Sequence, residues 1–161
     1  SIERALVVDC DVHHGNGTAA IFQDDAQVFT ISIHQFNNYP SVKPPSDIDI
    51  HLDDGVEDEE YLQKLEEKYV PALDDFKPQL VLYVAGADPY FDDQLGGLAL
   101  TIDGLRRRDT LVIKPAAARR IPIMSALAGG YAGHLDDTIN IQANTAKVMA
   151  EVAEESRRAA R

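Results

Sequence analysis

Two residues near the start of the chain have the types and spacing of metal ligands. Asp11 and His13 closely follow residues 5–8, a short apolar run rich in β-branched side chains that predicts a buried strand. In extended backbone, residues two apart point the same way, with Cα atoms about 6.8 Å apart. A carboxylate and an imidazole at this spacing can bind one ion at about 2.0 to 2.2 Å. Since Asp-x-His is also common in turns, the pair alone leaves both interpretations open.

Polar residues also follow three further apolar runs, at 27–33, 79–85 and 121–127, which are expected to be strands. The polar residues at the four strand ends are Asp9, Asp11 and His13, then Ser32 and His34, then Asp88, and finally Tyr131. The carboxyl ends of parallel strands share one edge of a sheet, where open α/β folds bind their ligands. Any one of these strand ends could be a simple turn, but all four together indicate a shared site.

Asp11, His13 and Asp88 offer two carboxylates and one imidazole, a donor set that suits a catalytic Zn²⁺ with one position left for water. The same donors accept Fe²⁺ or Mn²⁺, and the sequence does not choose among them. Such a metal polarises a carbonyl and lowers the pKa of its bound water toward 7. The phenol of Tyr131 could donate to the oxyanion that develops in a tetrahedral intermediate. The reaction class indicated is metal-assisted hydrolysis of an amide.

Helical patterns separate the expected strands. A short one opens at Thr18, and longer amphipathic patterns run over 57–76, 101–118 and 135–157. Strands that alternate with helices, and that are almost continuously apolar, predict a mostly parallel sheet with helices on both faces. With 161 residues, the chain is expected to form a single α/β domain over residues 1–161.

Some positions within these elements carry finer expectations. Pro71 predicts a kink or break late in the first long helix. Three consecutive arginines, 106–108, are expected on a solvated face of the second. A short half-buried strand is expected over 48–52, with His51 facing solvent. Cys10 is expected to be a small packing residue, because the acidic residues beside it disfavour a thiolate.

Composition limits the classes of partner. The formal net charge of −12 argues against direct binding to nucleic acid and is compatible with a cationic substrate. No apolar run is long enough to span a bilayer, and no basic-then-apolar leader is visible, so no membrane partner is expected. The single cysteine cannot form an internal disulfide, which fits a reducing compartment and a cytoplasmic location.

Three stretches carry a resemblance to a known family. They are Asp-Cys-Asp-Val-His-His-Gly-Asn-Gly-Thr at 9–18, Ala-Gly-Ala-Asp-Pro at 85–89 and Leu-Ala-Gly-Gly-Tyr at 127–131. In this order and spacing they resemble the zinc-dependent histone deacetylases. Asp-Gln-Leu-Gly-Gly-Leu at 93–98 is most similar to class IV deacetylases and their bacterial relatives. The resemblance covers nearly the whole chain.

The resemblance implies a three-layer α/β/α fold of the arginase/deacetylase type and removal of acetyl groups from a lysine peptide or a related amine. Asp11, His13 and Asp88 would bind zinc, and Tyr131 would be the transition-state tyrosine. An inner site for a structural monovalent cation, usually K⁺, would be formed by Asp9, Asp11, His13, Ser32 and Ile33. A second metal of the arginase kind is not expected, because Gly15 stands where that site needs a carboxylate.

One part of the family pattern has no match. Family members carry a tandem His-His upstream of the zinc motif, which supplies the general base and general acid, and this chain has eight residues before Asp9. The chain is therefore expected to be an incomplete fold, the C-terminal half of a catalytic domain. It would be a deacetylase that needs an upstream half, or a catalytically inactive remnant that binds a metal or a partner. Homodimerisation is a further expected way to cover its exposed surface.

Overall fold

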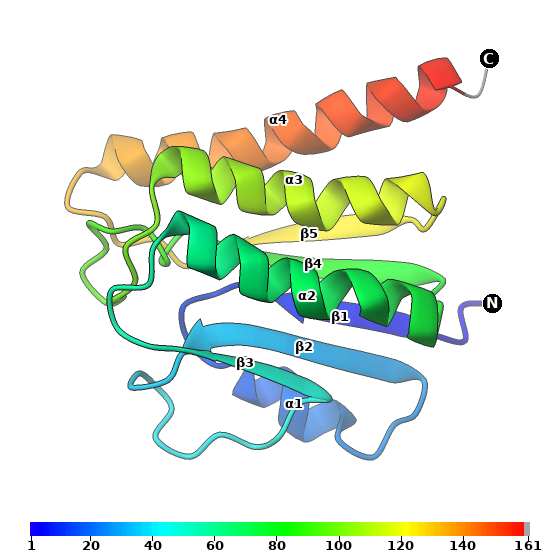
Figure 1. The fold of residues 1–161 in the computed structure, drawn as a ribbon, viewed down its shortest axis with the longest axis horizontal. Coiled ribbons are helices and arrows are strands. Elements are labelled where there is room, and N and C mark those ends of the chain that lie inside the picture. The colour runs from blue at the N-terminus through cyan, green and yellow to red at the C-terminus, as the bar shows by residue number, and fades with distance from the viewer. Residues whose placement is uncertain (160–161) are drawn as a thin grey trace.

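The computed structural model describes residues 1–159, whose helices and strands are arranged around one sheet (Figure 1). The elements, in chain order, are β1 (Ala5–Asp9), α1 (Asn16–Phe22), β2 (Val28–Gln35), β3 (Ile48–Leu52), α2 (Asp58–Phe76), β4 (Leu80–Gly86), α3 (Ile102–Ala118), β5 (Ile123–Ala128) and α4 (Leu135–Ala159). The five strands are ordered β3-β2-β1-β4-β5, and every pair is parallel. The predicted parallel α/β architecture is confirmed.

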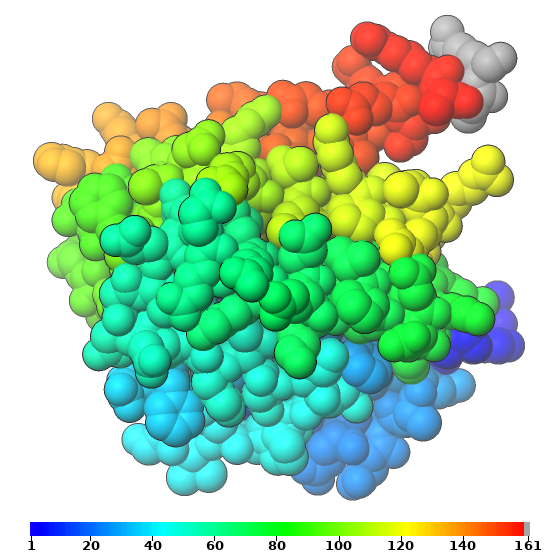
Figure 2. Space-filling model, in the orientation of Figure 1, coloured from blue at the N-terminus to red at the C-terminus, as the bar shows by residue number. Residues whose placement is uncertain are grey.

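The helices lie on both faces of the sheet. Phe29 of β2 packs against Phe76 of α2, with ring centroids 5.1 Å apart, whereas the Ser32 hydroxyl accepts a hydrogen bond from the N–H of Gly15, directly before α1. Residues three apart in a strand face opposite sides, so α1 and α2 lie on opposite faces. The side chains of α2 and α3 cover the face seen in Figure 2, and α4 packs against α3.

The main core lies between the sheet and the α2–α3 layer. Its fully buried members include Leu6, Val8, Val81 and Tyr83 from the strands and Leu65, Tyr69, Leu105 and Val112 from the helices. Each large apolar side chain that is buried here contributes about 1.5 to 3 kcal/mol. The helical spacing of the apolar residues in α2 predicts this packing. In addition, the Tyr69 hydroxyl donates a hydrogen bond to the carbonyl of Val112 at 2.9 Å.

Pro71 does not end or interrupt α2, which runs from Asp58 to Phe76, so the expected break is wrong. Proline removes one backbone hydrogen bond from a helix. Pro71 itself is exposed, while the next two residues, Ala72 and Leu73, are buried against the core. The packing of this last turn keeps it helical despite the missing bond.

One apolar surface of the sheet is not covered by any part of residues 1–159. The side chains of Val81, Tyr83 and Ala85 in β4 face the core, and the alternate residues of the strand are only half-buried. On the same side, Met124 of β5, which pairs with Leu82, is 56% exposed. In the described part of the chain β5 is an edge strand. Across residues 1–159, no helix combines the length and apolarity needed to cross a bilayer.

Candidate metal centre

The structure brings together the three residues that the sequence singled out as metal ligands. Asp11 and His13 follow β1, and Asp88 follows β4, which is the direct neighbour of β1 in the sheet. The Nδ1 atom of His13 lies 2.9 Å from Oδ1 of Asp11 and 3.4 Å from Oδ2 of Asp88. The three ligand atoms all lie within 4.8 Å of one another.

The donor set and its spacing fit a divalent metal. Ligand atoms at about 2.0 to 2.2 Å from a tetrahedral ion are separated from each other by about 3.3 to 3.6 Å. The separations of 2.9 and 3.4 Å between His13 and the two carboxylates are close to that range. Two carboxylates and one imidazole leave a fourth position for water or substrate. Small side-chain movements would therefore suffice to hold an ion.

The local electrostatics favour a bound cation. The hydrogen bond with Asp88, and then the interactions with Asp11, raise the pKa of His13 to about 9. Burial, followed by repulsion from Asp88, raises the pKa of Asp11. Burial also raises the pKa of Asp9 to about 7, although the hydrogen bond from the backbone N–H of Asp11 opposes the shift. A bound cation would relieve the repulsion among the three carboxylates.

Glycines allow the strand ends to approach one another. A Cβ atom on Gly86 would lie 2.6 Å from Cα of Asp11, and one on Gly129 would overlap the carboxylate of Asp88. Gly129 also has a φ of +57°, which side-chain-bearing residues rarely adopt. Asp88 is fixed further by the N–H of Val12, which donates to its Oδ1 at 2.9 Å. Because neither glycine carries a side chain, the backbone at Gly86 can lie against Asp11 and the backbone at Gly129 against Asp88.

Arg108 supports the site from within the core, which corrects the prediction of a solvated face for this residue. Its side chain is fully buried, and Nη1 donates to the carbonyl of Gly86 at 2.6 Å and to that of Cys10 at 3.4 Å. The charge is paired with Asp109, which also accepts from Tyr83 and Thr145. The sequence pattern itself indicates that Arg108 is buried. Leu105 and Val112, three residues before and four after Arg108, place it on the apolar face of α3.

Tyr131 lies outside the ligand cluster. Its side chain is 60% exposed, and its phenol makes no hydrogen bond with any residue of the described chain. Its backbone is held by Asp93, whose Oδ2 accepts from the N–H of Tyr131 at 2.6 Å. The Oδ1 atom of Asp93 accepts from the N–H groups of Leu95 and Gly96. Asp93 opens the stretch 93–98 that carries part of the family resemblance, but no role was predicted for its side chain.

The residues expected around a monovalent cation are neighbours in the sheet. Asp9 of β1 pairs with Ser32 of β2, and both are buried, as is Ile33. The Oδ1 atom of Asp9 accepts from the N–H of Asp11 at 3.0 Å. The Ser32 hydroxyl lies 3.0 Å from Nδ1 of His34, whose pKa burial lowers to about 4. Cys10, between Asp9 and Asp11 in the sequence, is buried as expected.

Comparison with known proteins decides the family. The model of the histone deacetylase domain matches residues 1–149. This chain belongs to the histone deacetylase family. An uncharacterized protein of Picosynechococcus is 46% identical over 137 residues, and a protein named probable deacetylase, of Archaeoglobus fulgidus, is 35% identical over 143 residues. The aligned regions cover 85% and 80% of this chain but 46% and 39% of those proteins. The chain thus spans less than half the length of these relatives.

Solved structures show the same fold. The HDA15 HD domain superposes with a TM-score of 0.78 and 27% identity, covering 92% of this chain and 45% of that one. An acetylpolyamine aminohydrolase from Burkholderia pseudomallei superposes with a TM-score of 0.77 and 24% identity, covering 94% of this chain and 46% of that one. The chain therefore has the three-layer α/β/α architecture of the arginase/deacetylase type, as the sequence motifs implied.

Proposed function

We propose that this chain provides the metal-binding part of a Zn²⁺-dependent deacetylase that acts on acetylated lysine or a related acetylated amine. The observation that carries this proposal is the cluster of Asp11, His13 and Asp88 at adjacent strand ends. The family supports the reaction class, and the named deacetylase and aminohydrolase relatives support an acetylated amine as substrate. The net charge of −12 favours a substrate whose remainder is cationic.

The residues divide the chemistry among them. Zn²⁺ bound by Asp11, His13 and Asp88 supplies a Lewis acid and a site for activating water, and Fe²⁺ or Mn²⁺ suits the same donors. The phenol of Tyr131 donates a hydrogen bond to the oxygen that becomes negative in the tetrahedral intermediate. Asp93 holds the backbone of Tyr131 in place through its hydrogen bond at 2.6 Å.

A monovalent cation bound next to the ligand residues would help to hold them in position. Asp9, Asp11, His13, Ser32 and Ile33 are the residues proposed to bind K⁺ there, partly through backbone carbonyls. A cation beside Asp9 would stabilise its carboxylate form, which burial disfavours. The hydrogen bond that Asp9 accepts from the N–H of Asp11 would then hold the backbone in place beside the proposed zinc ligands.

General acid and base groups are proposed to come from outside the described residues. Of the five histidines, His13 is a proposed ligand, three others meet in a separate cluster and His134 is exposed. None of the four non-ligand histidines hydrogen-bonds to Asp11, His13 or Asp88 within residues 1–159. A metal-binding domain without turnover is the second candidate function, and it is favoured by the same observation.

A hydrolysis assay separates the two candidates. The assay measures hydrolysis of an acetyl-lysine peptide in the presence of added Zn²⁺. It compares the chain alone with the chain fused to the part of the Picosynechococcus relative that lies outside the match. We expect the fusion to exceed the chain alone by about 10²- to 10⁴-fold, the usual contribution of positioned acid and base groups. Tyr131→Phe in the fusion should lower kcat by about 10²- to 10³-fold, as losing an oxyanion donor does.

Tyr39→Phe is the matched control for loss of an exposed phenol: the ring of Tyr39 lies edge-on to His13, with centroids 6.4 Å apart, and the substitution keeps that ring, so activity should be retained. Equal rates for Tyr131→Phe and the unaltered fusion would remove the role assigned to Tyr131. No hydrolysis by a folded, Zn²⁺-loaded fusion would favour the metal-binding domain without turnover.

A further inference from the structure

A second group of ligand atoms shares no residue with Asp11, His13 and Asp88. His14 follows β1, His34 lies in β2 and Asp49 lies in β3, and one ligand atom from each lies within 4.8 Å of the other two. The Nε2 atom of His14 is 3.1 Å from Oδ1 of Asp49, and the rings of His14 and His34 are perpendicular with centroids 4.6 Å apart. We call this group the His14 cluster.

One atom of the His14 cluster has no partner. The side chain of His14 is fully buried, and within residues 1–159 its Nδ1 atom makes no hydrogen bond. A buried polar atom without a partner costs about 1 to 3 kcal/mol, so native proteins usually pair such atoms with protein, water or an ion. The Nε2 atom, on the other side of the ring, is the nitrogen that faces Asp49, so an ion shared with Asp49 would bind His14 through Nε2.

The side chains of the cluster are held as metal ligands usually are. Asp49 accepts a hydrogen bond from the N–H of Ser46 at 3.0 Å through its other oxygen. The two ring nitrogens of His34 lie 3.0 Å from the Ser32 hydroxyl and 2.9 Å from Nδ1 of His51. An ion that binds one of these nitrogens replaces its hydrogen bond, and the hydrogen bond of the other nitrogen then fixes the ring.

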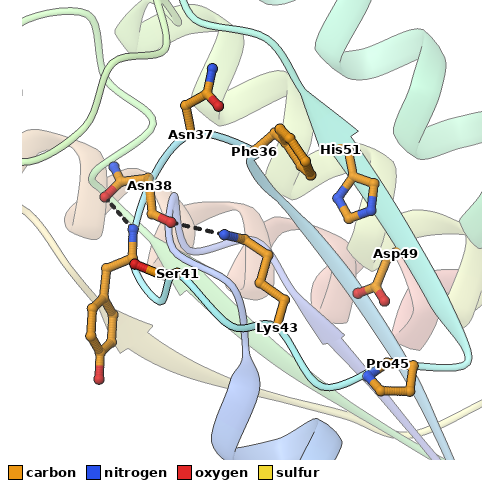
Figure 3. Close-up of a pocket in the computed structure, with 9 residues that line it drawn as sticks. Phe36, Asn37, Asn38, Ser41, Lys43, Pro45, Asp49 and His51 are labelled. Atoms are coloured by element: carbon orange, nitrogen blue, oxygen red, sulfur yellow. Dashed lines mark hydrogen bonds between the residues drawn. The ribbon is translucent and has the colours of Figure 1, made fainter.

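The cluster is reached from a pocket of about 840 Å³ (Figure 3). The loop that follows β2 forms one side of it, including Phe36 and Lys43, and Asp49 and His51 project from β3 on the other side. The side chain of Asp49 is 19% exposed, whereas that of His14 is fully buried. An ion entering from the pocket would therefore meet Asp49 first.

We propose that His14, His34 and Asp49 bind a second divalent transition-metal ion of the Zn²⁺ type. Two imidazoles and one carboxylate are a donor set that zinc uses, and they leave the fourth position for water. The three ligands come from the β1–α1 connection, β2 and β3, so the ion cross-links three segments that are far apart in the sequence. Such an ion stabilises the folded chain, because the unfolded chain does not hold the ligands together.

The test counts Zn²⁺ bound per chain by equilibrium dialysis and elemental analysis. We expect about two ions in the unaltered chain, and about one each in Asp11→Asn, His34→Gln and Asp49→Asn. His134→Gln is the matched control, because this exposed histidine lies outside the cluster, and it should keep about two. In the Asp11→Asn background, added Zn²⁺ should still raise Tm, and adding His34→Gln should abolish that increase.

The inference is overturned if His34→Gln and Asp49→Asn bind as much Zn²⁺ as His134→Gln. A single ion that is lost only in Asp11→Asn would also overturn it. A single ion lost only in His34→Gln would support it and would instead contradict the proposed deacetylase centre. The unaltered chain gives a readout that needs no variant: Zn²⁺ should shift the ring NMR signals of His14 and His34 but not those of His134. Unshifted His14 and His34 signals would contradict the second site.

Discussion

At the scale of single residues, the proposed metal centre brings groups of like charge close together. Asp9, Asp11 and Asp88 converge in a poorly solvated place, and among the described residues His13 contributes a compensating charge there. The sequence could predict that Asp11, His13 and Asp88 converge, because each follows an apolar strand of a parallel sheet. It could not predict the contribution of Asp93, since nothing in an acidic loop shows which carboxylate will bind the backbone of Tyr131.

The raised pKa of Asp9 predicts a pH dependence of stability. Burial raises this pKa from 3.8 to about 7. As pH rises, the unfolded chain therefore loses the proton of Asp9 at about pH 4, whereas the folded chain keeps it until about pH 7. The stabilisation from the protonated form is full below about pH 4 and is lost as pH rises through 7. Metal-free chain should therefore lose stability relative to Asp9→Asn over this interval, by at most about 1.4 kcal/mol per pH unit.

Urea unfolding of both proteins at several pH values in the presence of a chelator measures this difference. Asn keeps the oxygen that accepts from the N–H of Asp11, so the variant removes the titration while retaining a hydrogen-bond acceptor. A stability difference that does not change between pH 4 and 7 would contradict the assignment.

At the scale of elements, the strands and the long helices could be predicted because their apolar residues repeat with the period of each element. The same periodicity held the signal for Arg108, but three consecutive arginines resemble a solvated face. Only the structure shows that Arg108 reaches the carbonyls of Cys10 and Gly86, each close to a proposed ligand. α3 thus ties the ends of β1 and β4 together.

This arrangement predicts that Arg108 and its neighbour Arg107 differ sharply in stability effects. Arg108→Met leaves Asp109 buried and without its cation, and breaking a buried pair in this way costs about 3 to 5 kcal/mol. Arg107 forms an exposed ion pair with Glu59, so Arg107→Met should cost less than about 1 kcal/mol. Urea denaturation of both variants measures the two costs, and equal costs would contradict the role given to Arg108.

At the scale of the whole molecule, the chain spans 45% and 46% of the two solved structures compared above, and part of its sheet is uncovered within residues 1–159. Half-buried residues of β4 and exposed residues of β5 form an apolar surface opposite the α3 layer. Local sequence patterns could not predict this surface, because an apolar strand looks the same whether or not a neighbour covers it. We expect either a further segment or a second copy of the chain to cover it.

Self-association of the isolated chain is therefore predicted. Analytical ultracentrifugation should show a mass above that of the monomer that grows with concentration, because an uncovered apolar face and an open strand edge favour pairing. Met124→Glu should shift the chain toward monomer. Val42→Glu is the matched control, since Val42 is an exposed apolar residue on the loop between β2 and β3. A monomer at all concentrations for the unaltered chain would contradict the prediction.

The most direct test of the metal centre is anomalous X-ray scattering from crystals of the chain grown with Zn²⁺. Data collected on both sides of the zinc absorption edge locate the ion without reference to activity. The account predicts an anomalous peak bound by Asp11, His13 and Asp88, with ligand distances of about 2.0 to 2.2 Å, and its loss in crystals of Asp11→Asn. Zinc density that is absent from this position, while the three side chains keep their present arrangement, would contradict it.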